Sequence, residues 1–229
     1  MSSFTAGVIV FPGSNCDRDA AHAWKELGCG EAKLLWHRSS DLQGVDMVIV
    51  PGGFSYGDAL RAGAIARFAP IMDEVAKFAA GGGLVMGICN GFQILCEAGL
   101  LPGALARNEG LKFVCKHVDL RVETVASPFT GACEKGMALS IPIAHGEGRY
   151  ICDEATHAQL VAEDQILFRY VGGNPNGSQD DIAGVLGGPK RNVMGMMPHP
   201  ERAIRAGLGS TDGTCLFRSV LATLTQAQV

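Results

Sequence analysis

The 229-residue sequence lacks the features that define several large protein classes. No apolar run approaches the roughly 20 residues that a membrane-spanning helix needs, so we expect no membrane partner. Charged residues make up 18% of the chain and the net charge is −4, without a basic stripe, so we also expect no nucleic-acid partner. With 47% hydrophobic residues, the composition is that of a globular protein with a substantial core.

Nucleotide and metal motifs are also missing. Neither a G-x-x-x-x-G-K-[ST] loop nor a G-x-G-x-x-G pattern after a strand occurs, so we expect no cofactor on this chain. The six histidines show no H-x-x-x-H or H-E-x-x-H spacing, so we expect no metal site either. Any nucleotide chemistry that accompanies this protein must therefore take place on another chain.

Cysteine is present, but not in pairs of the C-x-x-C kind. The eight cysteines are spread along the chain, and the N-terminal residues do not resemble a secretory signal peptide. We therefore expect reduced thiols and a cytoplasmic location.

The first half of the chain alternates short apolar runs with helical periodicity. Residues 6–11, 32–36, 47–50 and 84–88 are typical of buried strands. Helical spacing follows the first of these runs and, over residues 60–75, predicts one long amphipathic helix. Strands that alternate with helices indicate a parallel sheet covered on both faces, with ligands at the carboxyl ends of the strands.

The second half has a different pattern. Residues 113–170 contain short alternating runs typical of antiparallel, partly solvated strands, which we interpret as an insertion or edge extension. Residues 182–186 and 193–197 resemble the two strands of a hairpin. The predicted fold class is therefore α/β, a doubly wound and mostly parallel sheet with an antiparallel extension, in a single domain over residues 1–229.

One cysteine occupies a position that favours chemistry. Gly87-Ile88-Cys89-Asn90-Gly91 is a G-x-Nuc-x-G nucleophile elbow with cysteine as the nucleophile, between a predicted strand and a helical pattern. The glycines remove the Cβ atoms that would block so sharp a turn. The start of a helix also favours the thiolate and supplies N–H groups for an oxyanion. For an isolated cysteine, a place in the apolar core would be the commoner explanation.

A histidine and a glutamate supply the groups that such a nucleophile requires. In Pro198-His199-Pro200-Glu201 the prolines favour an extended backbone, in which residues i and i+2 point to the same side. His199 can then act as the base, and Glu201 can hold its ring in one tautomer. The alternative for His199 is a histidine in a surface turn, which explains less once the elbow is present.

Five motifs along the chain carry a family resemblance. They are, in chain order, Phe-Pro-Gly-Ser-Asn-Cys-Asp at 11–17, Pro-Gly-Gly-Phe-Ser-Tyr-Gly-Asp at 51–58, Gly-Ile-Cys-Asn-Gly-Phe-Gln at 87–93, Ala-His-Gly-Glu-Gly-Arg at 144–149 and Gly-Met-Met-Pro-His-Pro-Glu-Arg at 195–202. With them the chain resembles the class I glutamine amidotransferases nearly end to end, which implies a flavodoxin-like fold. The second and fourth motifs point to glutaminase subunits that serve a separate synthetase of purine biosynthesis.

The resemblance implies a role for each catalytic group. Cys89 would attack the side-chain amide of glutamine. His199 would act as the base and then as the acid for the leaving ammonia, while Glu201 would orient His199. The backbone N–H groups of Gly53 and Asn90 would form the oxyanion hole.

Further substrate contacts are implied by the same resemblance. They are Gly52, Gln93, His145, Gly146 and Glu147. The alternative for Gln93 is an ordinary polar residue near a helix start. Glu147 and Arg149 are equally compatible with a surface ion pair or with contacts to a partner.

Three segments keep open roles. Residues 14–17 either belong to the site or form an Asx-type turn that caps the first helix, with Cys16 incidental. Residues 55–61 either shape the pocket or dock another subunit. Residues 174–178 have strong turn chemistry and are either a plain loop or part of a binding site.

We therefore expect a glutaminase that hydrolyses glutamine through a cysteine thioester and delivers ammonia to an ATP-dependent synthetase. The expected partners are glutamine and that large synthetase subunit, with or without a small accessory subunit, and ATP and Mg²⁺ are expected on the partner. The alternatives are a glutaminase subunit of another amidotransferase, a cysteine-dependent hydrolase on the same fold, and a regulatory subunit without activity. The last would require a lost nucleophile or base, and neither is lost.

Overall fold

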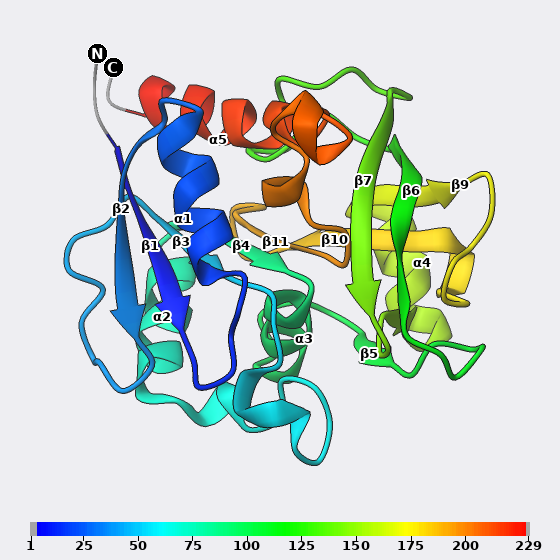
Figure 1. The fold of residues 1–229 in the computed structure, drawn as a ribbon, viewed down its shortest axis with the longest axis horizontal. Coiled ribbons are helices and arrows are strands. Elements are labelled where there is room, and N and C mark those ends of the chain that lie inside the picture. The colour runs from blue at the N-terminus through cyan, green and yellow to red at the C-terminus, as the bar shows by residue number, and fades with distance from the viewer. Residues whose placement is uncertain (1–3, 228–229) are drawn as a thin grey trace.

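A nine-stranded sheet organises the computed structural model, which describes residues 4–227 (Figure 1). In spatial order the strands are β2 (Gly30–Trp36), β1 (Phe4–Val10), β3 (Met47–Val50), β4 (Leu84–Ile88), β11 (Val193–Met196), β10 (Ile182–Gly187), β9 (Ile166–Val171), β6 (Val114–Val122) and β7 (Ala138–His145). The first five strands are parallel, and the other four continue the sheet in antiparallel fashion. The structure thus confirms an α/β fold with a parallel half and an antiparallel extension.

The antiparallel extension reaches beyond residues 113–170. The predicted hairpin is confirmed, because β10 pairs antiparallel with β11. On its other edge β10 pairs antiparallel with β9, so the hairpin joins the extension to the parallel half. A small second sheet pairs β5 (Ala104–Ala106) with β8 (Arg149–Ile151). The extension therefore continues the main sheet instead of folding apart from it.

Within residues 4–227, five α-helices cover the sheet. They are α1 (Asp17–Glu26), α2 (Pro70–Ala80), α3 (Asn90–Glu97), α4 (Glu154–Ala162) and α5 (Thr214–Gln226). From β1 the chain moves to β2 in one direction, and from β3 it moves to β4 in the other. Right-handed crossovers therefore place α1 and α2 on opposite faces of the sheet, as Figure 1 shows.

The single long helix expected over residues 60–75 is wrong. Residues 55–69 form two 3-10 turns, η1 (Ser55–Asp58) and η2 (Ala66–Phe68), and α2 begins only at Pro70. Leu60 has a positive φ of 70° and an exposed fraction of 91%, so it is not on a buried helix face. Proline lacks a backbone N–H and fits the first helical position, which explains why α2 starts there.

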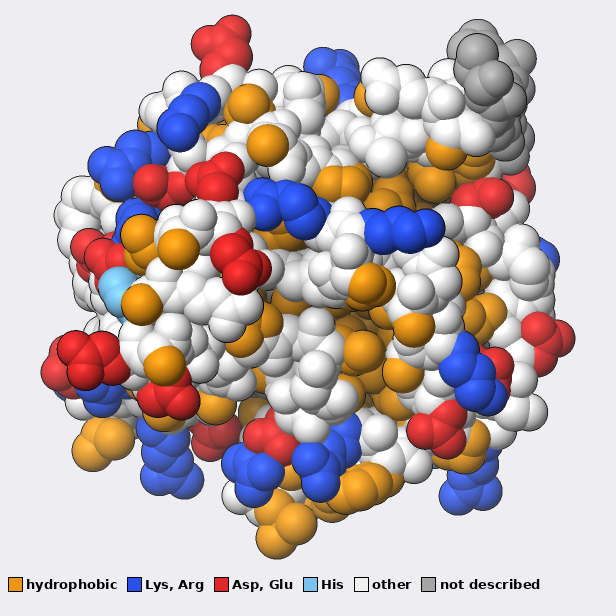
Figure 2. Space-filling model, turned by 180° about the vertical axis from the view of Figure 1, so that it is seen from behind, with side chains coloured by type: hydrophobic (Ala, Val, Ile, Leu, Met, Phe, Trp, Pro, Cys, Tyr) orange, Lys and Arg blue, Asp and Glu red, His pale blue; other side chains and the backbone are white. Residues whose placement is uncertain are grey.

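The surface mixes charges of both signs. On the face opposite to that of Figure 1, acidic and basic side chains are interspersed with apolar ones (Figure 2). Among residues 4–227, no helix combines the length and the apolar character needed to cross a bilayer.

Candidate active site

Cys89 lies at the sharp turn between β4 and α3, where the elbow pattern predicts it. Its backbone has φ 50° and ψ −107°, which a non-glycine residue adopts only under strain. A Cβ at Gly87 would lie 2.5 Å from Leu95, and a Cβ at Gly91 would lie 1.8 Å from the Val50 carbonyl oxygen. Both positions therefore require glycine for the turn to pack against its neighbours.

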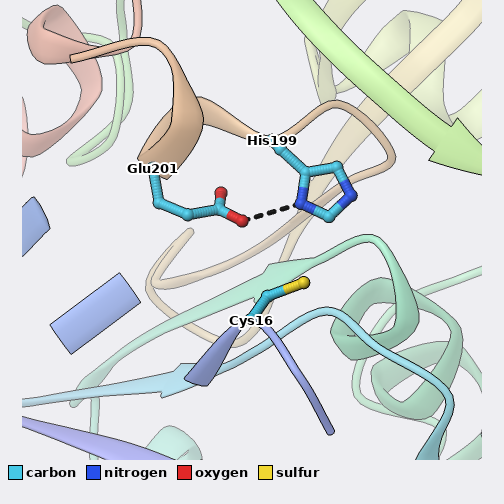
Figure 3. Close-up of side chains that lie close together, drawn as sticks. All are labelled: Cys16, His199 and Glu201. Atoms are coloured by element: carbon cyan, nitrogen blue, oxygen red, sulfur yellow. Dashed lines mark hydrogen bonds and ion pairs between the residues drawn. The ribbon is translucent and has the colours of Figure 1, made fainter. Parts of the chain in front are cut away.

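His199 and Glu201 follow β11, the parallel neighbour of β4. His199 Nδ1 lies 2.7 Å from Glu201 Oε1, and the two side chains have exposed fractions of 2% and 0% (Figure 3). The backbone N–H of His199 donates to the Pro142 carbonyl oxygen at 2.8 Å, which holds the turn against β7. Among the described residues, Nε2 of His199 has no hydrogen-bond partner, so it is free to exchange a proton.

Two opposing effects set the charge of His199. Burial lowers the pKa of the imidazole, whereas the charges of Glu201 and Cys89 raise it. The net result is a pKa well above the ordinary value. Glu201 can therefore stabilise a proton that His199 takes up at Nε2 and later donates to a leaving amine.

Cys89 borders two small cavities. The first, which we call the acidic cavity, has about 190 Å³ and is lined by Gly53, Phe54, Asp58, Cys89, Gln93, Phe113, Ala144, His145, Gly146 and Glu147. The second, which we call the histidine cavity, has about 140 Å³ and is lined by Asn15, Cys16, Gly53, Phe54, Cys89, Phe113, Ala144, His199 and Arg202. The thiol therefore faces the base on one side and most of the expected substrate contacts on the other.

The backbone beside Cys89 is compatible with an oxyanion hole. Gly53 has φ 137°, and a Cβ there would lie 2.6 Å from the Asn15 backbone nitrogen. Asn90 is the first residue of α3, where N–H groups have no acceptor within the helix. Gly52 faces the catalytic groups, because a Cβ there would lie 2.8 Å from His199 Cε1. The roles of Gly53 and Asn90 stay a prediction.

Side-chain hydrogen bonds tie α3 to the floor of the acidic cavity. Asn90 Oδ1 accepts from the Ser55 N–H at 3.1 Å, and Asn90 Nδ2 donates to Gln93 Oε1 at 2.9 Å and to Asp58 Oδ1 at 3.2 Å. Gln93 Nε2 donates to the Glu147 carbonyl oxygen at 2.5 Å. Gln93 is thus a part of the cavity wall and not an isolated polar residue.

Two carboxylates meet in the acidic cavity. Burial, and then the negative charge of Glu147, raise the pKa of Asp58 to about 6. The Glu147 carboxylate lies 3.6 Å from Arg107 Nε, whereas Arg149 donates to the Gly177 carbonyl oxygen. The interpretation of Glu147 and Arg149 as an ion pair is therefore wrong. A cation bound between Asp58 and Glu147 would relieve their repulsion.

Two buried asparagines support the turn that follows β7. Asn108 Oδ1 lies 3.1 Å from His145 Nδ1 and accepts from the Gly148 N–H at 2.9 Å. Asn176 Nδ2 donates to the Gly148 carbonyl oxygen at 2.8 Å. Burial, and then the charge of His199, lower the pKa of His145 to about 4, so its ring is neutral at pH 7. His145 anchors the cavity wall. Asn108 was not expected from the sequence, and Asn176 was covered only by the open prediction for residues 174–178.

Hydrogen bonds within residues 174–178 form a turn that buries the Asn176 side chain. Asn174 Oδ1 accepts from the N–H groups of Asn176, Gly177 and Ser178 at 3.2, 2.8 and 3.1 Å. Asn176 and Ser178 are buried. The segment is therefore a structural support of the acidic cavity, and its sequence signal predicted the turn but not what the turn holds.

Cys16 lies beside the catalytic groups, as Figure 3 shows. It receives a hydrogen bond from Arg202 Nη2 at 3.0 Å, and its thiol donates to Asn15 Oδ1 at 3.1 Å. A sulfur, a ring nitrogen and a carboxylate oxygen of Cys16, His199 and Glu201 lie within 4.8 Å of one another, the spacing of a metal-binding group. Histidine spacing along the sequence could not reveal this cluster, because its members come from both ends of the chain. Cys16 is not incidental to the site.

The segment 55–61 divides into an inner and an outer part. Ser55 is buried and its backbone N–H donates to Asn90, and Asp58 lines the acidic cavity, whereas Leu60 and Arg61 are exposed. Nearby, the half-exposed rings of Phe54 and Phe113 stack with centroids 6.4 Å apart over the mouth of both cavities. We call these two rings the apolar rim.

The sheet and the site together define a class of protein. An elbow cysteine and a carboxylate-steered histidine from adjacent parallel strands form the catalytic arrangement of a cysteine-dependent amidotransferase or hydrolase. The comparisons narrow this class. The family model of the CobB/CobQ-like glutamine amidotransferase domain matches residues 4–211.

Curated relatives and solved structures agree with that match. The chain is 56% identical over 223 residues to phosphoribosylformylglycinamidine synthase subunit PurQ from Salinibacter ruber, covering 94% of each chain. It is 55% identical to the subunit of the same name from Koribacter versatilis, with 94% of this chain and 96% of the relative covered. A chain in the structure of PurLQS from Thermotoga maritima superposes with a TM-score of 0.89 at 49% identity, covering 97% of this chain and all of that one.

A more distant structure shares the fold. A putative GMP synthase protein from Thermoplasma acidophilum superposes with a TM-score of 0.65 at 16% identity, covering 100% of this chain and 98% of that chain. At that identity the likeness concerns the fold alone. The chain belongs to the glutamine amidotransferase family and, within it, to the family of PurQ subunits.

Proposed function

We propose that this chain is the glutaminase subunit of a phosphoribosylformylglycinamidine synthase and releases ammonia from glutamine for purine biosynthesis. The observation that carries the proposal is the position of Cys89, strained at the elbow between the acidic cavity and the buried His199–Glu201 pair. The relatives that bear this name are more than half identical over almost their whole length.

The chemistry follows from the proton that His199 can hold at Nε2. His199 takes the proton of the Cys89 thiol, and the thiolate attacks the side-chain amide carbon of glutamine. The N–H groups of Gly53 and Asn90 would stabilise the tetrahedral oxyanion. When the C–N bond breaks, His199 returns the proton to the leaving nitrogen, which departs as ammonia. Water activated by His199 then cleaves the thioester to glutamate and restores the thiol.

The acidic cavity suits the amino-acid end of glutamine. The α-ammonium group would bring a positive charge to Asp58 and Glu147, in addition to Arg107, whose Nε lies 3.6 Å from the Glu147 carboxylate. Gln93 and the backbone of Gly146 line the same cavity and would hold the rest of the amino-acid end. Recognition would then depend on charge at one end of the substrate and on the thiol at the other.

A partner is needed to use the ammonia. The related chain from Thermotoga maritima was solved as part of PurLQS, and we propose an equivalent assembly with a large synthetase subunit and a small accessory subunit. ATP and Mg²⁺ would bind to the partner. The apolar rim exposes 46% of Phe54 and 55% of Phe113 beside the site, which favours docking there. Eight free thiols are compatible with a cytoplasmic location.

The decisive test separates glutamine use from the rest of the reaction. In the complex reconstituted with the synthetase, Cys89→Ala should abolish glutamine-dependent formation of phosphoribosylformylglycinamidine but preserve the reaction with added ammonium. Cys115→Ser, at an exposed thiol, is the matched control and should retain both activities. Glutamine turnover by Cys89→Ala would refute the mechanism. Product formation with a different acceptor only would assign the chain to another amidotransferase.

A further inference from the structure

Two cysteines outside the active site are in direct contact. Cys133 lies in the segment between β6 and β7, and Cys215 lies in the first turn of α5. They are 82 positions apart in the chain, yet their sulfur atoms are 2.8 Å apart. Because a disulfide bond is about 2.05 Å long, a shift of less than about 1 Å would bring the two sulfurs to bonding distance.

Backbone contacts hold the two residues in place. The Ala132 N–H donates to Ser219 Oγ at 2.9 Å, so the chain beside Cys133 is attached to α5 independently of the sulfurs. The Cys133 N–H donates to the Thr130 carbonyl oxygen at 2.9 Å, and Cys215 Sγ lies 3.2 Å from the Asp212 carbonyl oxygen. The contact therefore belongs to the packed fold and does not depend on two mobile side chains.

The chemistry of the pair favours oxidation. The side-chain hydrogen bond between the two thiols lowers the pKa of Cys133, which makes Cys133 the readier thiolate, while the pKa of Cys215 is raised. Cys133 has an exposed fraction of 9% and Cys215 is half-buried. The partial exposure of Cys215 lets a small oxidant reach the pair.

We propose that Cys133 and Cys215 are a modification site, at which a peroxide forms a reversible disulfide. The Cys133 thiolate attacks one oxygen of hydrogen peroxide, breaks the O–O bond and becomes a sulfenic acid, and the hydroxide released takes up the Cys133 proton to give water. The Cys215 sulfur then attacks the sulfenic sulfur, and the hydroxyl group leaves with the Cys215 proton as a second water. Two thiols lose two electrons and one peroxide gains them, and a reducing thiol reverses the bond.

The disulfide would fix the start of α5 against the turn that contains His199 and Glu201, which we call the catalytic turn. The Gly213 N–H donates to the Ala203 carbonyl oxygen at 2.8 Å, and a Cβ at Gly213 would lie 2.1 Å from the Pro200 carbonyl oxygen. Asp212 Oδ2 accepts from the Ser140 N–H of β7 at 2.7 Å. The start of α5 thus lies between the catalytic turn and the antiparallel extension, and a covalent tie there would stabilise both without using a catalytic group.

Trypsin provides a clean assay. Cleavage after Lys and Arg yields peptides 122–135 and 206–218, each of which contains one cysteine. After treatment of the full chain with hydrogen peroxide and digestion without reductant, we expect these two peptides joined, with a mass two hydrogen atoms below their sum. We also expect Tm to rise by roughly 5 to 15 °C, because the bond closes a long loop. Dithiothreitol should reverse both changes.

Matched variants make the test specific. Cys133→Ser should lose the linked peptide and the rise in Tm, Cys215→Ser should do the same if the first variant folds poorly, and Cys115→Ser should retain both. The proposal is overturned if Cys133 and Cys215 stay reduced after the exposed Cys115 is oxidised. Equal linkage of Cys133 to other cysteines, or linkage without a rise in Tm, would overturn it as well. None of these outcomes depends on glutaminase activity.

Discussion

On one side of Cys89 the proposed proton-transfer groups are buried and joined by a hydrogen bond, and on the other side the two proposed substrate-binding carboxylates repel each other. His199 and Glu201 share a 2.7 Å hydrogen bond in a buried turn at the end of β11. Asp58 and Glu147 are like charges in an irregular part of the chain, and their repulsion contributes to the raised pKa of Asp58. We infer that the free protein already has its proposed catalytic groups assembled, whereas the proposed recognition of glutamine would be completed only when the ligand binds.

The largest effect on activity should come from removing the Glu201 carboxylate that holds His199. Glu201→Gln keeps the size of the side chain but offers an amide to His199, which favours the wrong tautomer. We expect kcat to fall by roughly 10³- to 10⁴-fold with little change in KM for glutamine. Steady-state kinetics of the complex measure this, with the exposed Glu163→Gln as control. An unchanged kcat would show that Glu201 does not orient the base.

The next largest effect should be on stability, from removing the buried Asn176 that supports the acidic cavity. Asn176→Ala removes a buried amide and leaves the Gly148 carbonyl with only the longer hydrogen bond from Ser178 Oγ at 3.4 Å. We expect the free energy of unfolding to fall by about 2 kcal/mol, as measured by urea denaturation. The exposed Gln159→Ala on α4 should change it by less than about 0.5 kcal/mol. Equal stabilities of the two variants would mean that Asn176 supports nothing.

Asp58→Asn tests the proposed role of the two carboxylates in the acidic cavity. The substitution removes one of the two negative charges that would meet the α-ammonium group. We expect KM for glutamine to rise by roughly 10- to 100-fold and kcat to change little, because the charge pair acts in binding. Asp41→Asn, at the surface, should leave KM unchanged. A fall in kcat at constant KM would show that Asp58 acts in catalysis and not in substrate binding.

The pH dependence sharpens the same point. The pKa of Asp58 is raised from 3.8 to about 6, so the carboxylate that would bind the ammonium group is protonated as the pH falls through that value. KM for glutamine should therefore rise by roughly tenfold between pH 7 and pH 5 in the wild type and stay flatter in Asp58→Asn. For the free protein the sign is opposite: since the folded pKa exceeds the unfolded one, the contribution of Asp58 to stability is fully present below about pH 3.8 and is lost as the pH rises through about 6.

The same division explains what sequence could predict. The elbow and the His-Pro-Glu turn are local patterns at strand ends, so a few neighbouring residues are enough to predict their backbone geometry. The strand periods also predicted β3 and β4 correctly, because buried parallel strands are continuous apolar runs. Residues 60–75 misled the helical prediction, since Pro70 and several positive φ angles override the apolar spacing.

Contacts between residues far apart in the chain could not be predicted from the sequence. Cys16 lies close to His199 only because the loops after β1 and β11 converge. Asn108 and Asn176 both bond to Gly148 only because their segments converge on the turn after β7. Asp58 was included in an open segment, but its raised pKa results from burial and from a partner far along the chain. No local pattern encodes such pairs.

The place of β11 in the sheet has a consequence for the timing of activity during synthesis. This strand pairs with β4 on one side and with β10 on the other, yet it is the last strand of the sheet to be translated. A ribosome that has already made Cys89 must produce about a hundred further residues before the base can dock beside it. Partly made chains therefore cannot consume glutamine, and the metabolite is spared until a finished subunit is available to a partner.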